Sequence, residues 1–198
     1  MSSVKSEIKL LVFAGNPGTQ YRETRHNAGW LCLESLERSA SIGWSEKFVS
    51  RIGDIRLEGR QIRIQQPLSF MNKTGEPVRK ALDFFNLKPA EILVIHDELE
   101  LPFGTIQFRF GGGLGGHNGL RSLKQHLGTE NFYRLRFGIS RPSRGDVSSW
   151  VLSRFSSEEM PLMENLSDRT LKVLEEILKG HHNALINKKM NILEGMPL

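Results

Sequence analysis

The segment from Gly15 to Gly29 sets turn residues, amides and one histidine directly after an apolar run. We expect a helix to begin near Thr24, which places His26 in its first turn. There the positive end of the helix dipole favours the neutral imidazole. A neutral imidazole keeps a free lone pair, as a general base requires at neutral pH. The alternative for a lone histidine at a helix start is capping or packing.

Asp97 is the predicted partner of His26. It follows the apolar run Ile92 to Ile95, which is typical of a central strand buried on both faces. A carboxylate bonded to one ring nitrogen fixes the tautomer and stabilises the imidazolium. The chain has no Gly-x-Ser-x-Gly nucleophile elbow, so water is the predicted nucleophile. The alternative for Asp97 is a turn or capping residue.

Three asparagines also follow predicted strands: Asn16, Asn72 and Asn118. A carboxamide donates N–H to a carbonyl or a developing oxyanion without competing for the proton. In α/β sheets, ligands collect beyond the carboxyl ends of the strands. We therefore expect these amides to converge with His26 and Asp97 on one cleft, provided that the strands run in the same direction.

The glycine-rich segment Gly111 to Gly119 formally satisfies Gly-x-Gly-x-x-Gly. It lies halfway along the chain and contains polar residues that dinucleotide loops do not need, so we consider this signal weak. The glycines let the backbone approach a phosphate or sugar closely beside Arg109. His96-Asp97-Glu98 lacks the His-Glu-x-x-His spacing of a metal-binding helix. We predict neither a metal site nor a cofactor.

The composition is typical of a soluble globular protein, with 38% hydrophobic residues in 198. One cysteine, Cys32, excludes an internal disulfide. No apolar stretch approaches ~18 residues and the start has no cleavage pattern, so we expect a cytoplasmic protein without a membrane span.

Between Leu101 and Arg154, the sequence contains eight basic and two acidic residues, which give a local net charge of +6. This excess suggests a polyanion such as nucleic acid as partner, although a solvated face without a partner has a similar pattern.

Strand and helix patterns alternate along the chain. We predict strands at 8–14, 47–57, 60–66, 92–95, 105–110 and 132–139, and helices from near 24 and at 76–85, 120–127, 162–178 and 182–190. The hairpin 47–66 must add antiparallel pairing. The predicted fold is therefore a single-domain, three-layer α/β/α arrangement with a twisted mixed β-sheet flanked by helices. Within that domain, 1–198, we expect a disordered segment at 1–7, a mobile loop at 141–149 and C-terminal helices over 156–192.

Four motifs in order resemble those of the bacterial peptidyl-tRNA hydrolases. They are Asn-Pro-Gly-x-x-Tyr-x-x-Thr-Arg-His-Asn-Ala-Gly (16–29), Phe-Met-Asn-x-x-Gly (70–75), His-Asp-Glu-Leu-x-Leu-Pro (96–102) and Gly-Gly-Gly-x-Gly-Gly-His-Asn-Gly-Leu (111–120). The resemblance implies a cofactor-free monomer that cleaves the ester between a peptide and the terminal ribose of tRNA. Peptidyl-tRNA dropped from stalled ribosomes would be the substrate.

The resemblance also implies roles for individual residues. His26 would activate water, Asp97 would assist it, and Asn16 would sense the acylated amino end. The expected groove for the peptide and the 3′ end contains Tyr21, Phe70, Met71, Asn72, His117 and Asn118. Arg109 and Arg136 match basic positions that hold a tRNA phosphate.

Two departures and two alternatives accompany this interpretation. Phe13-Ala14 stands where the family usually has Gly-Leu, and Leu114 stands where a histidine is common. A non-catalytic RNA-binding protein on the same scaffold, like relatives that act in organellar intron splicing, would keep the basic groove and even the dyad. A nucleotide-dependent oxidoreductase is the weakest alternative, since it depends on the glycine-rich segment alone.

Overall fold

A mixed sheet occupies the centre of the computed structural model, which describes residues 7–57 and 59–193. Its strands lie in the order β2-β3-β4-β1-β5-β7-β6-β8. The neighbours β4, β1, β5 and β7 are parallel, and the outer strands pair antiparallel. The strands are Leu10–Phe13 (β1), Ser45–Lys47 (β2), Ser50–Leu57 (β3), Arg60–Pro67 (β4), Ile92–Glu98 (β5), Thr105–Phe110 (β6), Tyr133–Gly138 (β7) and Lys189–Asn191 (β8).

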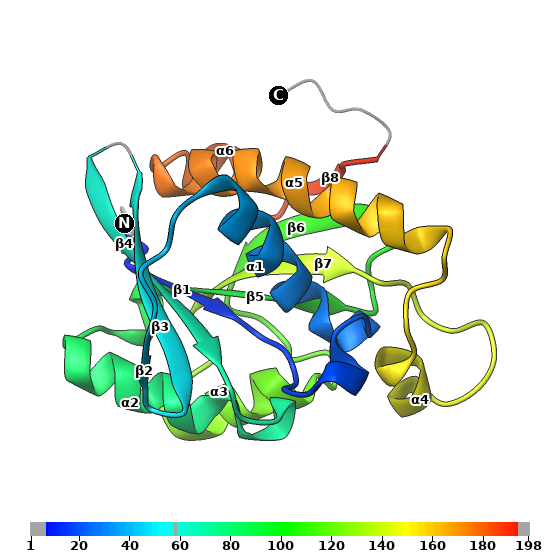
Figure 1. Ribbon diagram of the computed structural model, residues 1–198, viewed down its shortest axis with the longest axis horizontal. Helices are drawn as coiled ribbons and strands as arrows, with labels where there is room; N and C mark the ends of the chain where they lie inside the picture. The colour runs from blue at the N-terminus through cyan, green and yellow to red at the C-terminus, as the bar shows by residue number, and fades with distance from the viewer. Residues whose placement is uncertain (1–6, 58, 194–198) are drawn as a thin grey trace.

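The two faces of the sheet carry separate apolar layers, because successive side chains of a strand point to opposite faces. Leu11 and Phe13 pack on the side of α1 and α5, whereas Leu10 and Val12 pack on the side of α2 and α3 (Figure 1). The helices are Ala28–Ser39 (α1), Gly75–Phe85 (α2), Asn118–Leu127 (α3), Val147–Leu152 (α4), Glu159–Leu178 (α5) and His182–Leu185 (α6). This arrangement confirms the predicted three-layer α/β/α fold with a mixed sheet.

The predicted strand 47–57 is divided by a tight turn. Phe48 and Val49 adopt left-handed backbone, with φ of 56° and 52°, so β2 ends before them and β3 begins after them. Two consecutive positive φ angles suit a two-residue hairpin. Bulky and β-branched residues rarely adopt that conformation, so the local sequence does not announce the turn. Phe48 packs against Phe84 of α2, with 5.3 Å between the ring centroids.

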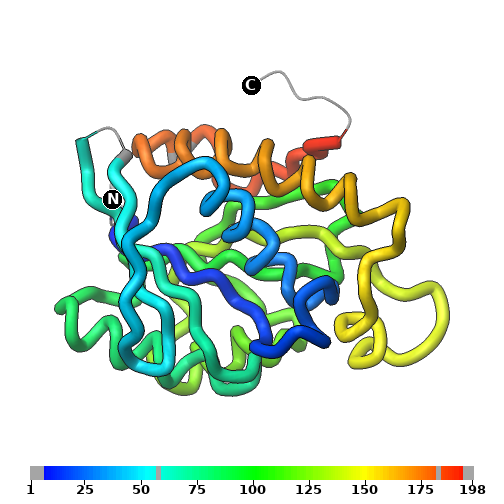
Figure 2. Tube along the Cα trace, viewed as in Figure 1, coloured from blue at the N-terminus to red at the C-terminus, as the bar shows by residue number. Residues whose placement is uncertain are grey.

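The predicted loop 141–149 is shorter in the structure, because α4 begins at Val147. Asp146 caps this helix by accepting a hydrogen bond from the Ser149 amide. The remaining loop belongs to the yellow segment that projects from the body in Figure 2.

The predicted helices over 156–192 end in a strand. The helix expected at 182–190 stops at Leu185, and β8 then pairs antiparallel with β6. The edge of β6 offers unpaired backbone donors and acceptors to β8, and this pairing overrides the helical pattern. Of the segment expected to be disordered, residues 1–6 lie outside the described residues, and Ile8 is buried. None of the helices in the described ranges is both long and apolar enough to cross a membrane.

Candidate active site

His26 and Asp97 contact each other although they are far apart in sequence. His26 lies in the 3₁₀ turn η2 (Arg25–Asn27) before α1, and Asp97 lies near the end of β5. His26 Nδ1 is 2.8 Å from Asp97 Oδ1. A carboxylate oxygen only accepts, so Nδ1 donates and the lone pair of Nε2 is left available. Both side chains line the same cleft.

The environment of the dyad shifts both pKa values. Burial lowers the pKa of His26, but the charge and the hydrogen bond of Asp97 outweigh burial and raise the pKa above 6.5. The helix dipole alone would lower the pKa of His26. The prediction from the dipole was therefore in the wrong direction, because it left out the effect of the Asp97 carboxylate. Burial acts to raise the pKa of Asp97, but His26 and His117 hold that pKa well below 3.8. Asp97 is therefore ionised at neutral pH and stabilises the imidazolium of His26.

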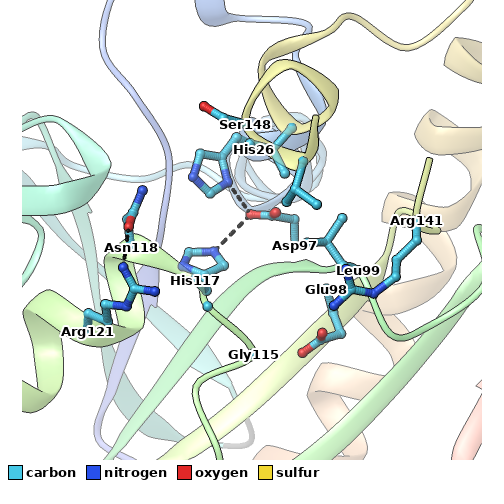
Figure 3. Close-up of a pocket in the computed structure, with 13 residues that line it drawn as sticks. His26, Asp97, Glu98, Leu99, Gly115, His117, Asn118, Arg121, Arg141 and Ser148 are labelled. Carbon is cyan, nitrogen blue, oxygen red and sulfur yellow. Dashed lines mark hydrogen bonds and ion pairs between the residues drawn. The ribbon is translucent and has the colours of Figure 1, made fainter. Parts of the chain in front are cut away.

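His117 is a second imidazole on the same carboxylate oxygen. Its Nε2 lies 2.9 Å from Asp97 Oδ1 (Figure 3), and its Nδ1 accepts the backbone N–H groups of Gly119 and Leu120 at the start of α3. A ring nitrogen that accepts carries no proton, so Nε2 is protonated and donates to Asp97. We predicted His117 as a substrate-binding residue, whereas the structure engages both of its nitrogens within the protein.

The segment from Gly111 to His117 reaches the site by an unexpected route. It follows β6, which runs antiparallel to β7. The C-terminal end of β6 therefore lies at the end of the strands that is farther from Asp97. Gly111 N donates to Phe132 O before β7, and the segment then returns along the sheet until His117 meets Asp97. Positive φ angles, which side chains with a β-carbon rarely adopt, support this reversal at Gly111, Gly112, Gly115 and Gly116.

The side chains of His26, Asp97 and His117 offer ligand atoms within 4.8 Å of one another, a spacing that suits a metal ion. Metal ligation requires unprotonated nitrogens. The nitrogens that face Asp97 are its hydrogen-bond donors, so this pattern favours proton transfer over metal binding.

His96 lies beside these side chains and donates from Nδ1 to Asp97 O. Burial, His117 and Arg134 hold the pKa of His96 well below 6.5.

Asn16 is oriented by two neighbours: Met71, which the sequence analysis placed in the groove, and Asn27, which it did not assign to the site. Its Oδ1 accepts the backbone N–H of Met71 at 2.8 Å. Its own backbone N–H and C=O bond to the side chain of Asn27 at 2.8 and 3.0 Å. Because Oδ1 is occupied, Nδ2 remains as the donor for a ligand. The available signal for Asn27 was its place directly after His26 in the first motif.

Other predicted groove residues lie in the segments that follow β1 and β4. The rings of Tyr21 and Phe70 meet edge to face with centroids 6.2 Å apart, and Phe70 is 52% exposed. Met71 is buried, and a β-carbon on Gly119 would lie only 2.6 Å from its sulfur. This close approach explains why glycine follows Asn118 in the fourth motif.

The last two predicted amides are exposed at the starts of helical segments. Asn72 lies in the 3₁₀ turn η3 (Met71–Lys73), and Asn118 is the first residue of α3. Arg121 donates to Asn118 Oδ1 at 3.3 Å, as Figure 3 shows. Leu114, which replaces the common histidine, packs against the apolar layer below α3.

A cleft of about 380 Å³ opens beside the dyad. Its walls include the glycine-rich segment, helix α4 and two exposed arginines, Arg121 and Arg141. Asn16 and its neighbours, which follow β1 and β4, do not line this cleft. The expected convergence on one cleft therefore holds for His26, Asp97 and Asn118, and it stays a prediction for Asn16 and Asn72.

Three arginines of β6 and β7 share one face of the sheet: Arg109, Arg134 and Arg136. Arg134 donates to the carbonyls of Gly112 and Gly113. Burial and the charges of Arg109 and Arg136 lower the pKa of Arg134 to about 10.

The other two arginines of this face differ in their partners. Arg136 pairs with Glu98, with 2.8 Å between Nε and Oε2, and also bonds Gln107. The guanidinium of Arg109 has neither an ion pair nor a hydrogen bond within residues 7–57 and 59–193. Arg109 is therefore the arginine of this face with charge available to a ligand.

The comparisons with known proteins identify the family of the chain. The family model described as peptidyl-tRNA hydrolase matches residues 10–195. The peptidyl-tRNA hydrolase of Treponema pallidum is 43% identical over 184 residues, which cover 90% of this chain and 91% of the relative. That of Desulfitobacterium hafniense is 39% identical over 168 residues, covering 84% and 91%.

Solved structures show the same fold. The crystal structure of peptidyl-tRNA hydrolase from Acinetobacter baumannii has a TM-score of 0.83 and 38% identity, covering 91% of this chain and 93% of the other. A peptidyl-tRNA hydrolase in complex with N-propanol has a TM-score of 0.85 and 36% identity, covering 96% and 97%. The chain therefore belongs to the peptidyl-tRNA hydrolase family.

Proposed function

We propose that this enzyme hydrolyses the ester bond between a peptide and the 3′-terminal ribose of tRNA, with His26 as the general base. The observation that carries the proposal is the 2.8 Å bond between His26 Nδ1 and Asp97 Oδ1, which leaves Nε2 available beside the cleft. An ester is already activated, so an oriented water and a base supply the chemistry. The reaction releases free tRNA from peptidyl-tRNA that has dissociated from stalled ribosomes.

The reaction proceeds in two steps. His26 Nε2 removes a proton from water while the water oxygen attacks the ester carbonyl carbon. Asp97 stabilises the imidazolium, and the former carbonyl oxygen carries the negative charge. The bond between that carbon and the ribose oxygen then breaks, and His26 returns the proton to the ribose. The products are a peptide with a free carboxyl group and a tRNA with a free terminal hydroxyl.

The amide groups orient the substrate. Because Oδ1 of Asn16 is held by Met71, Nδ2 presents a donor to the carbonyl oxygen of the acylated amino end. A free aminoacyl group instead carries an ammonium, which offers no acceptor to that donor. Tyr21, Phe70 and Asn72 flank the peptide on this side. Asn118, on the other side of His26, contacts the 3′ end of the tRNA.

The basic face binds the tRNA body. Arg109 supplies a guanidinium without an ion-pair partner among the described residues, and we place a backbone phosphate of the acceptor stem against it. Arg136, which Glu98 already engages, adds positive potential behind that contact. The proposed mechanism uses residues of one copy of the chain and requires no cofactor.

Release of N-acetylated amino acid from N-acetyl-aminoacyl-tRNA by the purified protein, with a metal chelator present, tests the proposal. We expect multiple turnovers at neutral pH and little release from the matching aminoacyl-tRNA. A protein that binds both tRNAs equally and cleaves neither would instead be the non-catalytic RNA-binding protein considered above.

His26→Asn tests the proposed base directly. The variant should lose about 100-fold or more in kcat while its melting temperature and tRNA affinity stay near wild type. His181→Asn is the matched control. The side chain of His181 is 59% exposed, and among the described residues it bonds only Glu176. Near wild-type turnover by His26→Asn would exclude His26 as the base.

A further inference from the structure

Helix α4 forms one wall of the cleft without a fully buried residue of its own. Val147, Ser148 and Val151 line the cleft, while Trp150 and Val151 are partly buried against the apolar core. The helix has six residues, and helices of this length are not stable without tertiary contacts. The contacts of Trp150 and of the residues that flank the helix must therefore hold this wall in place.

Arg25, which directly precedes His26 in the turn η2, supplies several of those contacts. Its guanidinium lies over the ring of Trp150 in α4, 3.9 Å from the centroid, and 4.9 Å from the ring centroid of Phe155. Arg25 Nε donates to Ser153 Oγ at 3.3 Å, and its backbone N–H donates to Ser153 O at 3.0 Å. Ser153 directly follows α4, so both ends of Arg25 hold this helix.

The charge of Arg25 is neutralised by α5. Its two Nη atoms donate to the two carboxylate oxygens of Glu159 at 3.1 and 2.6 Å. Glu159 is itself held by a reciprocal capping pair with Ser156. The side chain of Arg25 is 6% exposed and that of Glu159 is 27% exposed, so the pair is partly removed from water. Two-pronged pairs of this kind fix the geometry of both side chains more tightly than single-contact surface ion pairs.

We propose that Arg25 is a positioning residue of the active site, which sets the distance between α4 and the turn that carries His26. This inference rests on the proposed hydrolase function. Arg25 does not touch the substrate. It acts through Trp150 and Ser153, which hold the cleft wall at the width that a bound 3′ end requires. Arginine is needed because its planar fork stacks on an indole and binds a carboxylate at the same time.

Arg25→Lys is the decisive variant, since it keeps the charge but loses the planar stack and the two-pronged pair. The wall then moves, while His26 and Asp97 keep their own bond. We expect KM for N-acetyl-aminoacyl-tRNA to rise about tenfold and kcat to fall less than about threefold. Arg38→Lys is the control, because Arg38 also links α1 to α5 through Asp168 but both side chains are more than half exposed. The control should leave both constants unchanged.

Trp150→Leu removes the same stack from the other side, together with the hydrogen bond from Trp150 Nε1 to Ser140 O, and keeps Arg25 paired with Glu159. It should also raise KM, and the double variant should show less than the product of the two single effects, because both remove one contact. A loss of kcat with unchanged KM in both single variants would overturn the proposal, since a general loss of folded enzyme gives that result.

Hydrogen exchange provides a readout that does not need turnover. In Arg25→Lys, the amides of Ser149, Trp150 and Ser153 should exchange at least about tenfold faster than in wild type, while those of β5 stay unchanged. Unchanged exchange in α4 would overturn the proposed anchoring, even if the hydrolase function holds. If the wild type shows no hydrolysis, the proposed function fails separately, and accelerated exchange confined to α4 still supports the anchoring by Arg25.

Discussion

At the scale of single residues, one carboxylate oxygen serves two imidazoles. His26 and His117 both donate to Asp97 Oδ1, and burial strengthens these interactions by excluding water. His117 cannot rotate away without also releasing the amides at the start of α3. The carboxylate is therefore held by α3 on one side while it orients the base on the other.

This arrangement sets the pH dependence of the proposed reaction. His26 must be neutral to accept a proton, and its pKa is raised above 6.5, so kcat/KM should increase with pH and reach half its plateau above 6.5. Asp97→Asn removes the charge that favours the imidazolium. The variant should lower the plateau about 100-fold and move the midpoint to lower pH, as measured in a full pH–rate profile. Asp54→Asn, at an exposed position of β3, should change neither. An unmoved midpoint in Asp97→Asn would make Asp97 purely structural.

Asn16 offers a second prediction at this scale. In Asn16→Asp, one carboxylate oxygen can still accept from Met71, and the other replaces the Nδ2 donor with an acceptor that suits an ammonium. The ratio of kcat/KM for N-acetyl-aminoacyl-tRNA over aminoacyl-tRNA should fall about tenfold. Paired assays of the two substrates measure this ratio, and Asn131→Asp, on the surface, should leave it unchanged. A preserved ratio in Asn16→Asp would place substrate discrimination elsewhere.

At the scale of elements, two segments adopt positive φ angles, which residues with a β-carbon disfavour. One segment uses glycines at these positions and the other does not. The segment from Gly111 to Gly116 reverses direction with glycines at its positive φ angles. The β2–β3 turn reaches positive φ with Phe48 and Val49 instead. Left-handed backbone costs a residue with a β-carbon about 1–2 kcal/mol, so this turn stores strain.

Val49→Gly should therefore stabilise the protein. Val49 is 61% exposed, so little packing is lost, and glycine adopts φ of 52° without the steric penalty. We expect the free energy of unfolding to increase by about 1 kcal/mol, measured by urea denaturation. Val49→Ala is the matched control, because it removes the same apolar surface and keeps a β-carbon. Equal effects of glycine and alanine would show that the backbone strain is not the cause.

At the scale of the whole molecule, the proposed mechanism places the peptide and the tRNA body in different regions. The dyad lies at the ends of parallel strands, with Asn16 after β1 and the cleft of His117 and α4 beside β5. Arg136, Arg134 and Arg109 follow one another along β7 and β6, away from the Asp97 end of the strands. In the proposed mechanism, a tRNA body bound on this face is held apart from the reacting ester.

Arg109→Ala tests this separation. The variant should raise KM for intact N-acetyl-aminoacyl-tRNA about tenfold and lower the slope of log K against log salt by about one phosphate contact. A short 3′ fragment with the same ester lacks the distant phosphate, so its KM should not change. Arg79→Ala, whose side chain pairs with Asp83 on the exposed face of α2, is the control. Equal losses on both substrates would place Arg109 at the reacting end.

Local sequence patterns were enough to predict the chemical groups of the site and the layers of the fold that carry them. The apolar run before Asp97 and the turn before His26 are local patterns, so both the buried strand β5 and the position of the histidine at a helix start follow from them. The three-layer fold follows as well, because buried parallel strands need helices on both faces. The partnership of His26 with Asp97 was inferred from what each group lacks, a neighbour for a desolvated carboxylate and an orienting acceptor for an imidazole.

The contacts between groups that are distant in sequence could be known from the folded structure alone. His117 reaches Asp97 through a glycine-rich segment whose path has no local preference, because glycine populates both signs of φ almost equally. Arg25 meets Trp150 and Glu159 across more than 100 residues of chain, and β8 forms because the edge of β6 is open to it. Periodicity reports how a segment orients its own side chains. Periodicity does not indicate which other segment packs against that face, and the geometry around His26 depends on that packing.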